Sequence, residues 1–103
     1  MNQFNDKRQY HGYWEKYYSN GNPWYKGHYI NGSVNGYWEQ YYNHNGKLFC
    51  KGCYINGIKD GYWEQYYPDG KLSYKGNFIN DEYIGYWEWY EKNGSLINKE
   101  FHL

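Results

Sequence analysis

The sequence predicts an all-β fold: a single-domain repeat protein with a continuous antiparallel meander of about eight strands, arranged as stacked β-hairpins in a strongly twisted sheet. A segment that begins Gly-Tyr-Trp-Glu recurs at Gly12, Gly36, Gly61 and Gly85, at intervals of 24, 25 and 24 residues. Asn-Gly and Asp-Gly pairs, which favour tight hairpin turns, separate short runs rich in Tyr, Trp, Phe and Ile. Helical periodicity is absent, and aromatic residues reach 26%, so the core has to consist largely of rings.

The repeat divides the chain into a terminal segment and four units. Residues 1–11 are expected to form a degenerate N-terminal half-unit or cap, and residues 12–103 the repeat domain. The four units span residues 12–35, 36–60, 61–84 and 85–103. The last unit ends in Glu100-Phe101-His102-Leu103 and departs from the Lys-Gly ending of the other units; atypical terminal units are typical of repeat arrays.

Within each unit, turn position and strand length predict the pairing of the two strands. A two-residue turn at Asp69-Gly70 places Glu64 opposite Lys75 and Tyr66 opposite Ser73. The first and last units follow the same scheme, and a three-residue loop at residues 44–46 absorbs one extra residue in the second. The predicted pairs are Glu15–Lys26, Glu39–Lys51, Glu64–Lys75 and Glu88–Lys99, with Trp14 over Gly27, Trp38 over Gly52, Trp63 over Gly76, and Trp87 in the same structural position.

Further turns connect successive units. Turns at Asn31-Gly32, Asn56-Gly57 and Asn80-Asp81 are expected to pair Gly27 with Gly36 and the equivalent glycines of the later units. Strand alternation then assigns the two faces of the sheet. The apolar face, carrying Trp63 and Phe78 in the third unit, is the expected core, and a lone sheet of this size either curls or pairs with a second copy.

The opposite face is the candidate partner-binding surface, because it combines aromatic rings with alternating Glu and Lys. The predicted register places Tyr17 beside Trp24 and Tyr41 beside Phe49. Rigid aromatic side chains dominate protein-binding surfaces, although the same rings could simply shield the sheet. The proposed binding residues are Tyr13, Tyr17, Trp24, Tyr37, Tyr41, Phe49, Tyr62, Tyr66 and Tyr90, and Tyr86 extends the row.

No residue pattern predicts catalysis, a metal or a cofactor. Cys50 and Cys53 form a C-x-x-C pair without a second ligand pair, and on a strand their three-residue offset points the thiols to opposite faces. The glutamates recur with each unit and face lysines, which favours a structural ladder over catalytic carboxylates, normally a singular pair. The four histidines show no ligand spacing.

Composition restricts the partners and the compartment. Eleven basic and eleven acidic side chains give a formal net charge of +0, which makes nucleic acid an unlikely partner and gives no general attraction to anionic membranes. The sequence has no 18-residue apolar run and no N-terminal signal-peptide pattern. A cytoplasmic location with reduced cysteines is therefore the expectation.

The repeated pattern Gly-Tyr-Trp-Glu-x-Tyr-Tyr, followed by Gly-x-Leu-x-x-x-Gly-x-Tyr-x-Asn-Gly, resembles the MORN repeat, and in particular the variant of bacterial antitoxin-like proteins. The resemblance covers residues 12–103 and departs from the pattern at residues 80–84 and at Trp89. It implies an elongated sheet of stacked hairpins that serves as a protein-binding or scaffold element, or associates with membranes. The matched residues of the second unit are Gly36, Trp38, Tyr41, Tyr42, Asn45, Gly46, Leu48, Gly52, Tyr54, Asn56 and Gly57.

These observations together predict a non-enzymatic protein-binding repeat module that acts as a scaffold, an inhibitor or an antitoxin-like protein. Its partner is another protein or a second copy in a homodimer, and free edge strands offer a second route to association. Two alternatives remain open: binding of a sugar, choline or nucleotide on an aromatic platform, and peripheral membrane association.

Overall fold

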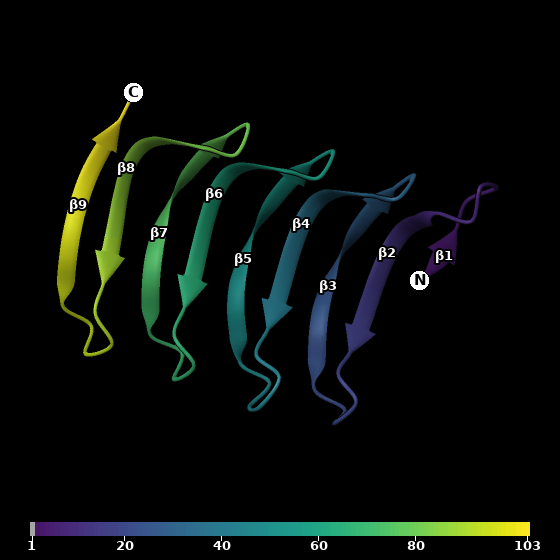
Figure 1. Ribbon diagram of the computed structural model, residues 1–103, viewed down its shortest axis with the longest axis horizontal. Helices are drawn as coiled ribbons and strands as arrows, with labels where there is room; N and C mark the ends of the chain where they lie inside the picture. Colours follow the sequence, from purple (N-terminus) through teal and green to yellow (C-terminus); the bar gives the residue numbers. More distant parts are fainter. Residues whose placement is uncertain (1) are drawn as a thin grey trace.

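The computed structural model describes residues 2–103 and contains one sheet of nine antiparallel strands, with no helix in that range. Each strand pairs with its neighbours in sequence, as the meander prediction required (Figure 1). The ninth strand arises because the N-terminal segment contributes a two-residue strand. The strands are β1 (Gln3–Phe4), β2 (Tyr10–Tyr17), β3 (Pro23–Ile30), β4 (Ser33–Tyr41), β5 (Leu48–Ile55), β6 (Ile58–Tyr66), β7 (Leu72–Ile79), β8 (Glu82–Tyr90) and β9 (Leu96–His102).

The sheet is open and one layer deep. Its Cα atoms extend over 47 × 36 × 12 Å, and Figure 1 shows the strands side by side from β1 at one edge to β9 at the other. A twist of about 20° per strand would turn the last strands well out of the plane. Because the sheet is only 12 Å deep, its twist is smaller than the strong twist that we expected.

The turns inside the hairpins differ from the two-residue turns that we expected. The amide of Tyr67 donates to the carbonyl of Lys71 at 2.8 Å, so the loop has three residues and Gly70 occupies the left-handed bulge position with φ 94°. A second bulge at Ser73 then restores the register, because Gln65 lies opposite Tyr74. The predicted pairing of Tyr66 with Ser73 is therefore wrong.

The other hairpins share this compensation. A register shift follows the turn in each of them, and the predicted opposition of Glu and Lys holds in all four. In the second hairpin the amide of Tyr42 donates to the carbonyl of Lys47, so four residues form the loop instead of the expected three.

The links between hairpins contain the expected two-residue turns. Asn31 and Gly32 have φ 48° and 87°, values typical of a type I′ turn. The expected pairing of Gly27 with Gly36 is wrong, however, because Gly36 has φ 96° and lies in a bulge of β4 that brings Trp38 opposite Gly27. The other two links show a shift at the same place.

The indoles pack toward the preceding hairpin. A Cβ atom added to Gly27 would lie 2.5 Å from Cε3 of Trp38, and Gly52 and Gly76 are covered in the same way by the next tryptophan along the chain. The prediction that each indole covers the glycine of its own hairpin is therefore wrong, although Trp and Gly are opposite there in the backbone register. The corrected covering pairs are Trp38 over Gly27, Trp63 over Gly52 and Trp87 over Gly76.

The core lies on this face, which we call the tryptophan face, as strand alternation predicted. Trp63 is 1% exposed and Trp87 is 0% exposed, although no second layer covers the sheet. Neighbouring rings bury each other instead: Tyr25 stacks on Trp38 with centroids 4.7 Å apart, for example. The buried residues of the tryptophan face are Trp14, Tyr25, Trp38, Cys50, Trp63, Phe78 and Trp87.

Candidate protein-binding face

The opposite side, which we call the glutamate face, carries one glutamate per hairpin between two tyrosines. Tyr37 donates its hydroxyl hydrogen to Oε2 of Glu39 at 2.9 Å, and Tyr41 donates to Oε1 at 2.5 Å. The alternation Tyr-x-Glu-x-Tyr places all three side chains on one face of a strand. We call this arrangement, in which two tyrosine hydroxyl groups donate to one carboxylate, a clamp. The same clamp joins Tyr13 and Tyr17 to Glu15, and Tyr62 and Tyr66 to Glu64. In the last hairpin Tyr90 alone donates to Glu88.

In the clamps of Glu15 and Glu64, the hydrogen bonds lower the pKa of the glutamate and raise the pKa of its two tyrosines. The hydroxyl groups of Tyr17 and Tyr13 hold the pKa of Glu15 below its ordinary value. Burial, together with the hydrogen bond to Glu39 and its negative charge, raises the pKa of Tyr37 to about 12. The clamps are therefore formed by ionised glutamates and neutral phenols over the whole physiological pH range.

We expect the protein to lose stability as the pH rises from 10 to 12. The pKa of Tyr13 and Tyr37 is about 12 in the folded chain against 10 when unperturbed, so between pH 10 and 12 the unfolded chain releases protons that the folded chain keeps. The free energy of unfolding therefore falls as pH rises through this range. Melting temperatures measured from pH 9 to 12 should decline by more than the roughly 4–8 °C that corresponds to 1 kcal/mol in a domain of this size.

The Tyr37→Phe variant provides the control for this expectation. It removes one phenol with a raised pKa, so its melting temperature should fall less steeply with pH than that of the wild type. A melting temperature that stays constant to pH 12 in the wild type would contradict the clamp.

Lysines link the glutamates of neighbouring hairpins. Nζ of Lys51 lies 3.4 Å from Oε1 of Glu64, and Nζ of Lys75 lies 3.3 Å from Oε1 of Glu88. Within the last hairpin, Lys99 lies 3.8 Å from Oε2 of Glu88. The closest charge pairs thus connect successive hairpins, whereas we predicted pairs within each hairpin. An exposed ion pair contributes little stability individually. We therefore infer that this row of charges mainly sets the register between neighbouring hairpins.

The clamped tyrosine rings of the glutamate face remain accessible although their hydroxyl groups are engaged. Tyr17 is 54% exposed, and Tyr37 and Tyr62 are each 48% exposed. Tyr86 is 64% exposed and packs its ring on Phe101 with centroids 4.6 Å apart. The surface therefore presents rings at a spacing of two strands, each ring held in one orientation.

A shallow cavity of about 290 Å³ interrupts this surface between Tyr62 and Tyr86. Gly76 and Asn77 also line it, and Lys75 and Lys99 lie beside Glu88 at its rim. The cavity thus separates two neighbouring rings of the glutamate face.

Trp24 and Phe49 do not lie where the sequence analysis placed them. The bulges after the turns put Tyr17 opposite Pro23, while Trp24 stacks on Tyr18 with centroids 5.6 Å apart. Phe49 contacts Tyr42 and packs against the buried cluster of the tryptophan face. The predicted neighbours Tyr17–Trp24 and Tyr41–Phe49 are therefore wrong, because one bulge residue redirects each side chain. The seven predicted tyrosines do share the glutamate face.

The two cysteines lie on opposite faces, as expected. Cys50 belongs to the buried cluster, and burial raises its pKa to about 11. Cys53 is exposed and lies opposite Tyr37 of the glutamate face. Within residues 2–103, no group of three or more His, Cys, Asp or Glu side chains is placed to hold a metal ion.

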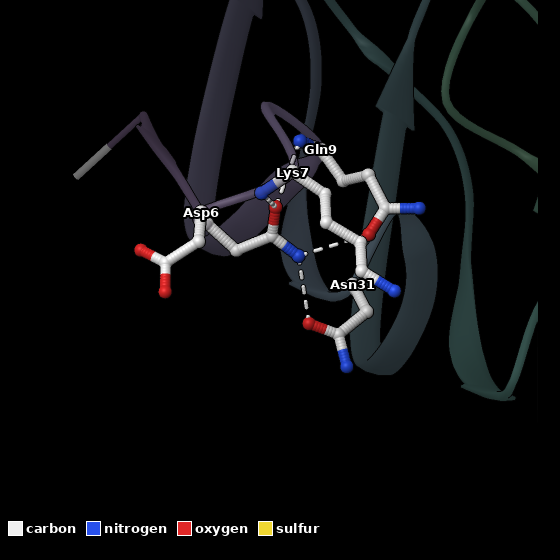
Figure 2. Close-up of a pocket in the computed structure, with 5 residues that line it drawn as sticks. Asp6, Lys7, Gln9 and Asn31 are labelled. Carbon is white, nitrogen blue, oxygen red and sulfur yellow. Dashed lines mark hydrogen bonds between the residues drawn. The ribbon is translucent and has the colours of Figure 1, made fainter.

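A polar cluster fixes the N-terminal segment (Figure 2). The side-chain amide of Asn5 donates to Oε1 of Gln9 at 2.9 Å and to Oδ1 of Asn31 at 2.8 Å. Its own Oδ1 accepts hydrogen bonds from the amides of Lys7 and Gln9. These hydrogen bonds connect the N-terminal segment to the turn at Asn31-Gly32. The cavity of about 410 Å³ beside them is therefore a consequence of how the segment packs on that turn.

Fold and surface together define a class: an open repeat protein of stacked β-hairpins, with one face that forms the core and one that presents ordered aromatic rings. The sequence matches the MORN repeat variant at residues 10–31 and 59–80, which correspond to the first and third hairpins. These two matches are consistent with a MORN repeat protein, and repeats of this family often mediate binding. No curated protein matches the sequence. The described residues include no helix that is long and apolar enough to cross a membrane.

Proposed function

We propose that this chain is a non-enzymatic module that binds another protein through the glutamate face. The observation that carries the proposal is the row of exposed tyrosine rings whose hydroxyl groups are held by Glu15, Glu39 and Glu64. Tyrosine is enriched at protein-binding surfaces because it offers a large contact area with few rotatable bonds.

The clamps reduce the conformational entropy that is lost on association. Ordering a flexible side chain at an interface costs about 0.5–1.5 kcal/mol, and a ring that is already fixed avoids most of this cost. Tyr37 is held by its hydrogen bond to Glu39 of the same strand, and its backbone pairs with Cys53 of β5. Lysines between the rings add positive charge next to each carboxylate, which suits a partner surface of mixed charge.

We also propose that the chain acts in the cytoplasm, as a scaffold, an inhibitor or an antitoxin-like protein. In each role the module acts by occupying a surface of its partner. The glutamate face supports binding to a folded protein surface better than binding to a small molecule, because the cavity between Tyr62 and Tyr86 is shallow and the rings lie side by side along the sheet.

The test starts from a partner isolated from the native source with the intact chain as bait and then purified. The double variant Tyr37→Ala/Tyr62→Ala removes two central rings and should weaken binding of the purified partner at least about 100-fold, the effect of losing hot-spot contacts. Titration calorimetry measures the affinity, and circular dichroism checks that the strands persist.

The matched control is Ile30→Ala/Ile79→Ala, which removes two side chains of similar exposure at the ends of strands. It should leave the affinity within about threefold of the wild type. By strand alternation Ile30 and Ile79 lie on the same face but at the strand ends, outside the tyrosine row. Equal loss in both double variants, or no loss in either, would therefore contradict binding through the tyrosine rings.

A further inference from the structure

The two edges of the sheet differ sharply in how much backbone and apolar side chain they expose to solvent. Strand β9 forms one edge, and Leu96, Ile97 and Phe101 are 51%, 58% and 55% exposed. An edge strand with unpaired backbone groups and exposed apolar side chains is a ready template for another strand.

The other edge is covered. Strand β1 pairs with the start of β2, and beyond it the side chain of Asn2 continues the ladder. Its Nδ2 donates to the carbonyl of Glu15 at 3.0 Å, and its Oδ1 accepts from the amide of Glu15 at 2.8 Å. The outer edge of β2 is therefore satisfied along most of its length.

Two glutamates prevent another hairpin of the same kind from stacking on β9. Glu100 stands where Gly27, Gly52 and Gly76 receive the indole of the following hairpin. Glu91 stands where a tyrosine hydroxyl donates to a carbonyl of the following hairpin, and an ionised carboxylate cannot donate that bond. The replaced tyrosine bonds are Tyr18 to Tyr41, Tyr42 to Tyr66 and Tyr67 to Tyr90.

We propose that β9 pairs antiparallel with β9 of a second copy, which closes the exposed edge in a two-fold homodimer. Head-to-tail stacking is disfavoured because one edge is covered and the other carries Glu91 and Glu100. Pairing of identical edges about a two-fold axis uses the open edge twice and leaves no further edge of that kind.

Charge selects the register of this pairing. The register centred on Lys99 aligns all seven residues of β9, and it places Asn98 opposite Glu100 of the second copy on both sides of the axis. The register centred on Glu100 would instead place two carboxylates opposite each other. At the chosen axis each Lys99 already lies 3.8 Å from Glu88 of its own chain, which reduces the repulsion between the two ammonium groups.

The same pairing also covers apolar surface. In the Lys99-centred register, Phe101 reaches the level of Ile97 of the second copy, and Leu96 the level of His102. A two-fold axis perpendicular to the sheet keeps the glutamate faces of both copies on one side. The dimer would present one continuous glutamate face, but its formation does not depend on the proposed function.

A cysteine cross-link tests both the dimer and its register. In a Cys53→Ser background, Lys99→Cys places two thiols opposite each other at the axis, within the Cα separation of about 4.4–6.8 Å that a disulfide requires. Mild oxidation of the full chain should convert most of it to a covalent dimer on non-reducing gels. Light scattering of the uncross-linked wild type should give twice the mass of one chain.

Ser95→Cys in the same background is the matched control. It lies just before the same strand, but the proposed register separates the two copies of this residue by eight positions along the strands, so cross-linking should be at least about tenfold slower. In addition, Ile97→Lys/Phe101→Lys should shift the mass to that of a monomer, whereas Ile55→Lys/Ile79→Lys should not.

A monomeric wild type at about 0.5 mM, far above typical dimer dissociation constants, would overturn the proposal. Equal cross-linking of the two cysteine variants would overturn the register, and with it the antiparallel pairing of β9. The edge variants change the ring that packs on Tyr86 but leave the central rings Tyr37 and Tyr62 intact. Their loss of dimer is therefore distinguishable from the loss of partner binding in Tyr37→Ala/Tyr62→Ala.

Discussion

Replacement of Gly52 by alanine is expected to lower the free energy of unfolding by about 3 kcal/mol, the upper range for overpacking a core. The new Cβ atom would fall within contact distance of Cγ, Cδ2 and Cε2 of Trp63, a ring that is 1% exposed. The ring cannot yield easily, because its Nε1 donates to the carbonyl of Cys53 at 3.0 Å and Tyr54 packs against it edge-on. Denaturant titration of both proteins measures the difference.

Two variants separate this effect from a general weakening of β5. Cys53→Ala changes the next residue, which is exposed, and should alter the free energy of unfolding by less than about 0.5 kcal/mol. Adding Trp63→Leu to Gly52→Ala should make the two changes strongly non-additive, because the smaller side chain leaves room for the methyl group. A fully additive double variant would show that the indole and the glycine do not meet.

The sequence was sufficient to predict the meander, the opposition of Glu64 and Lys75, and the buried face. Each of these rests on a signal that repeats four times, so errors at one turn do not propagate. The two-residue alternation within each strand places Trp63 of β6 and Phe78 of β7 on the apolar side of its own strand. The core face was therefore predictable even though no second layer covers it.

Turn geometry and bulges were not predictable in the same way. An Asp-Gly pair such as Asp69-Gly70 fits both a two-residue type I′ turn and a three-residue loop with a glycine bulge. Both solutions place Glu64 opposite Lys75, since the bulge at Ser73 offsets the longer loop. The charge pairs could not distinguish the two, and the positions of Trp24 and Phe49 depend on that difference.

The direction in which the indole rings point could not be predicted from the sequence either. Backbone register places Trp63 opposite Gly76, but packing selects the rotamer that covers Gly52 of the preceding hairpin. One signal in the sequence was available for the glutamate face: the spacing Tyr-x-Glu-x-Tyr, as in Tyr62, Glu64 and Tyr66, brings two hydroxyl groups to one carboxylate. The binding role of the tyrosines stays a prediction that the capture experiment addresses.

Removal of the Trp63 side chain is expected to cost about 3–5 kcal/mol, the usual range for truncation of a buried tryptophan. The ring joins the second and third hairpins: it covers Gly52 of β5, donates to the carbonyl of Cys53, and stacks under the ammonium group of Lys59 at 4.8 Å. In a repeat array, stability is approximately the sum of the units and the interfaces between neighbours. Trp63→Ala therefore weakens the central interface and should uncouple the two halves of the sheet.

Uncoupling changes the shape of the unfolding transition as well as its midpoint. Urea unfolding of Trp63→Ala should have a lower m-value than the wild type, because the two halves lose structure separately and each exposes less surface. Trp14→Ala is the matched control, since Trp14 is 4% exposed but lies near the edge of the sheet, where its Nε1 donates to the carbonyl of Gln3 at 2.9 Å. It should lower stability while the m-value stays that of the wild type. An unchanged m-value in both variants would show that the sheet unfolds as a single unit, with no special role for the central indole.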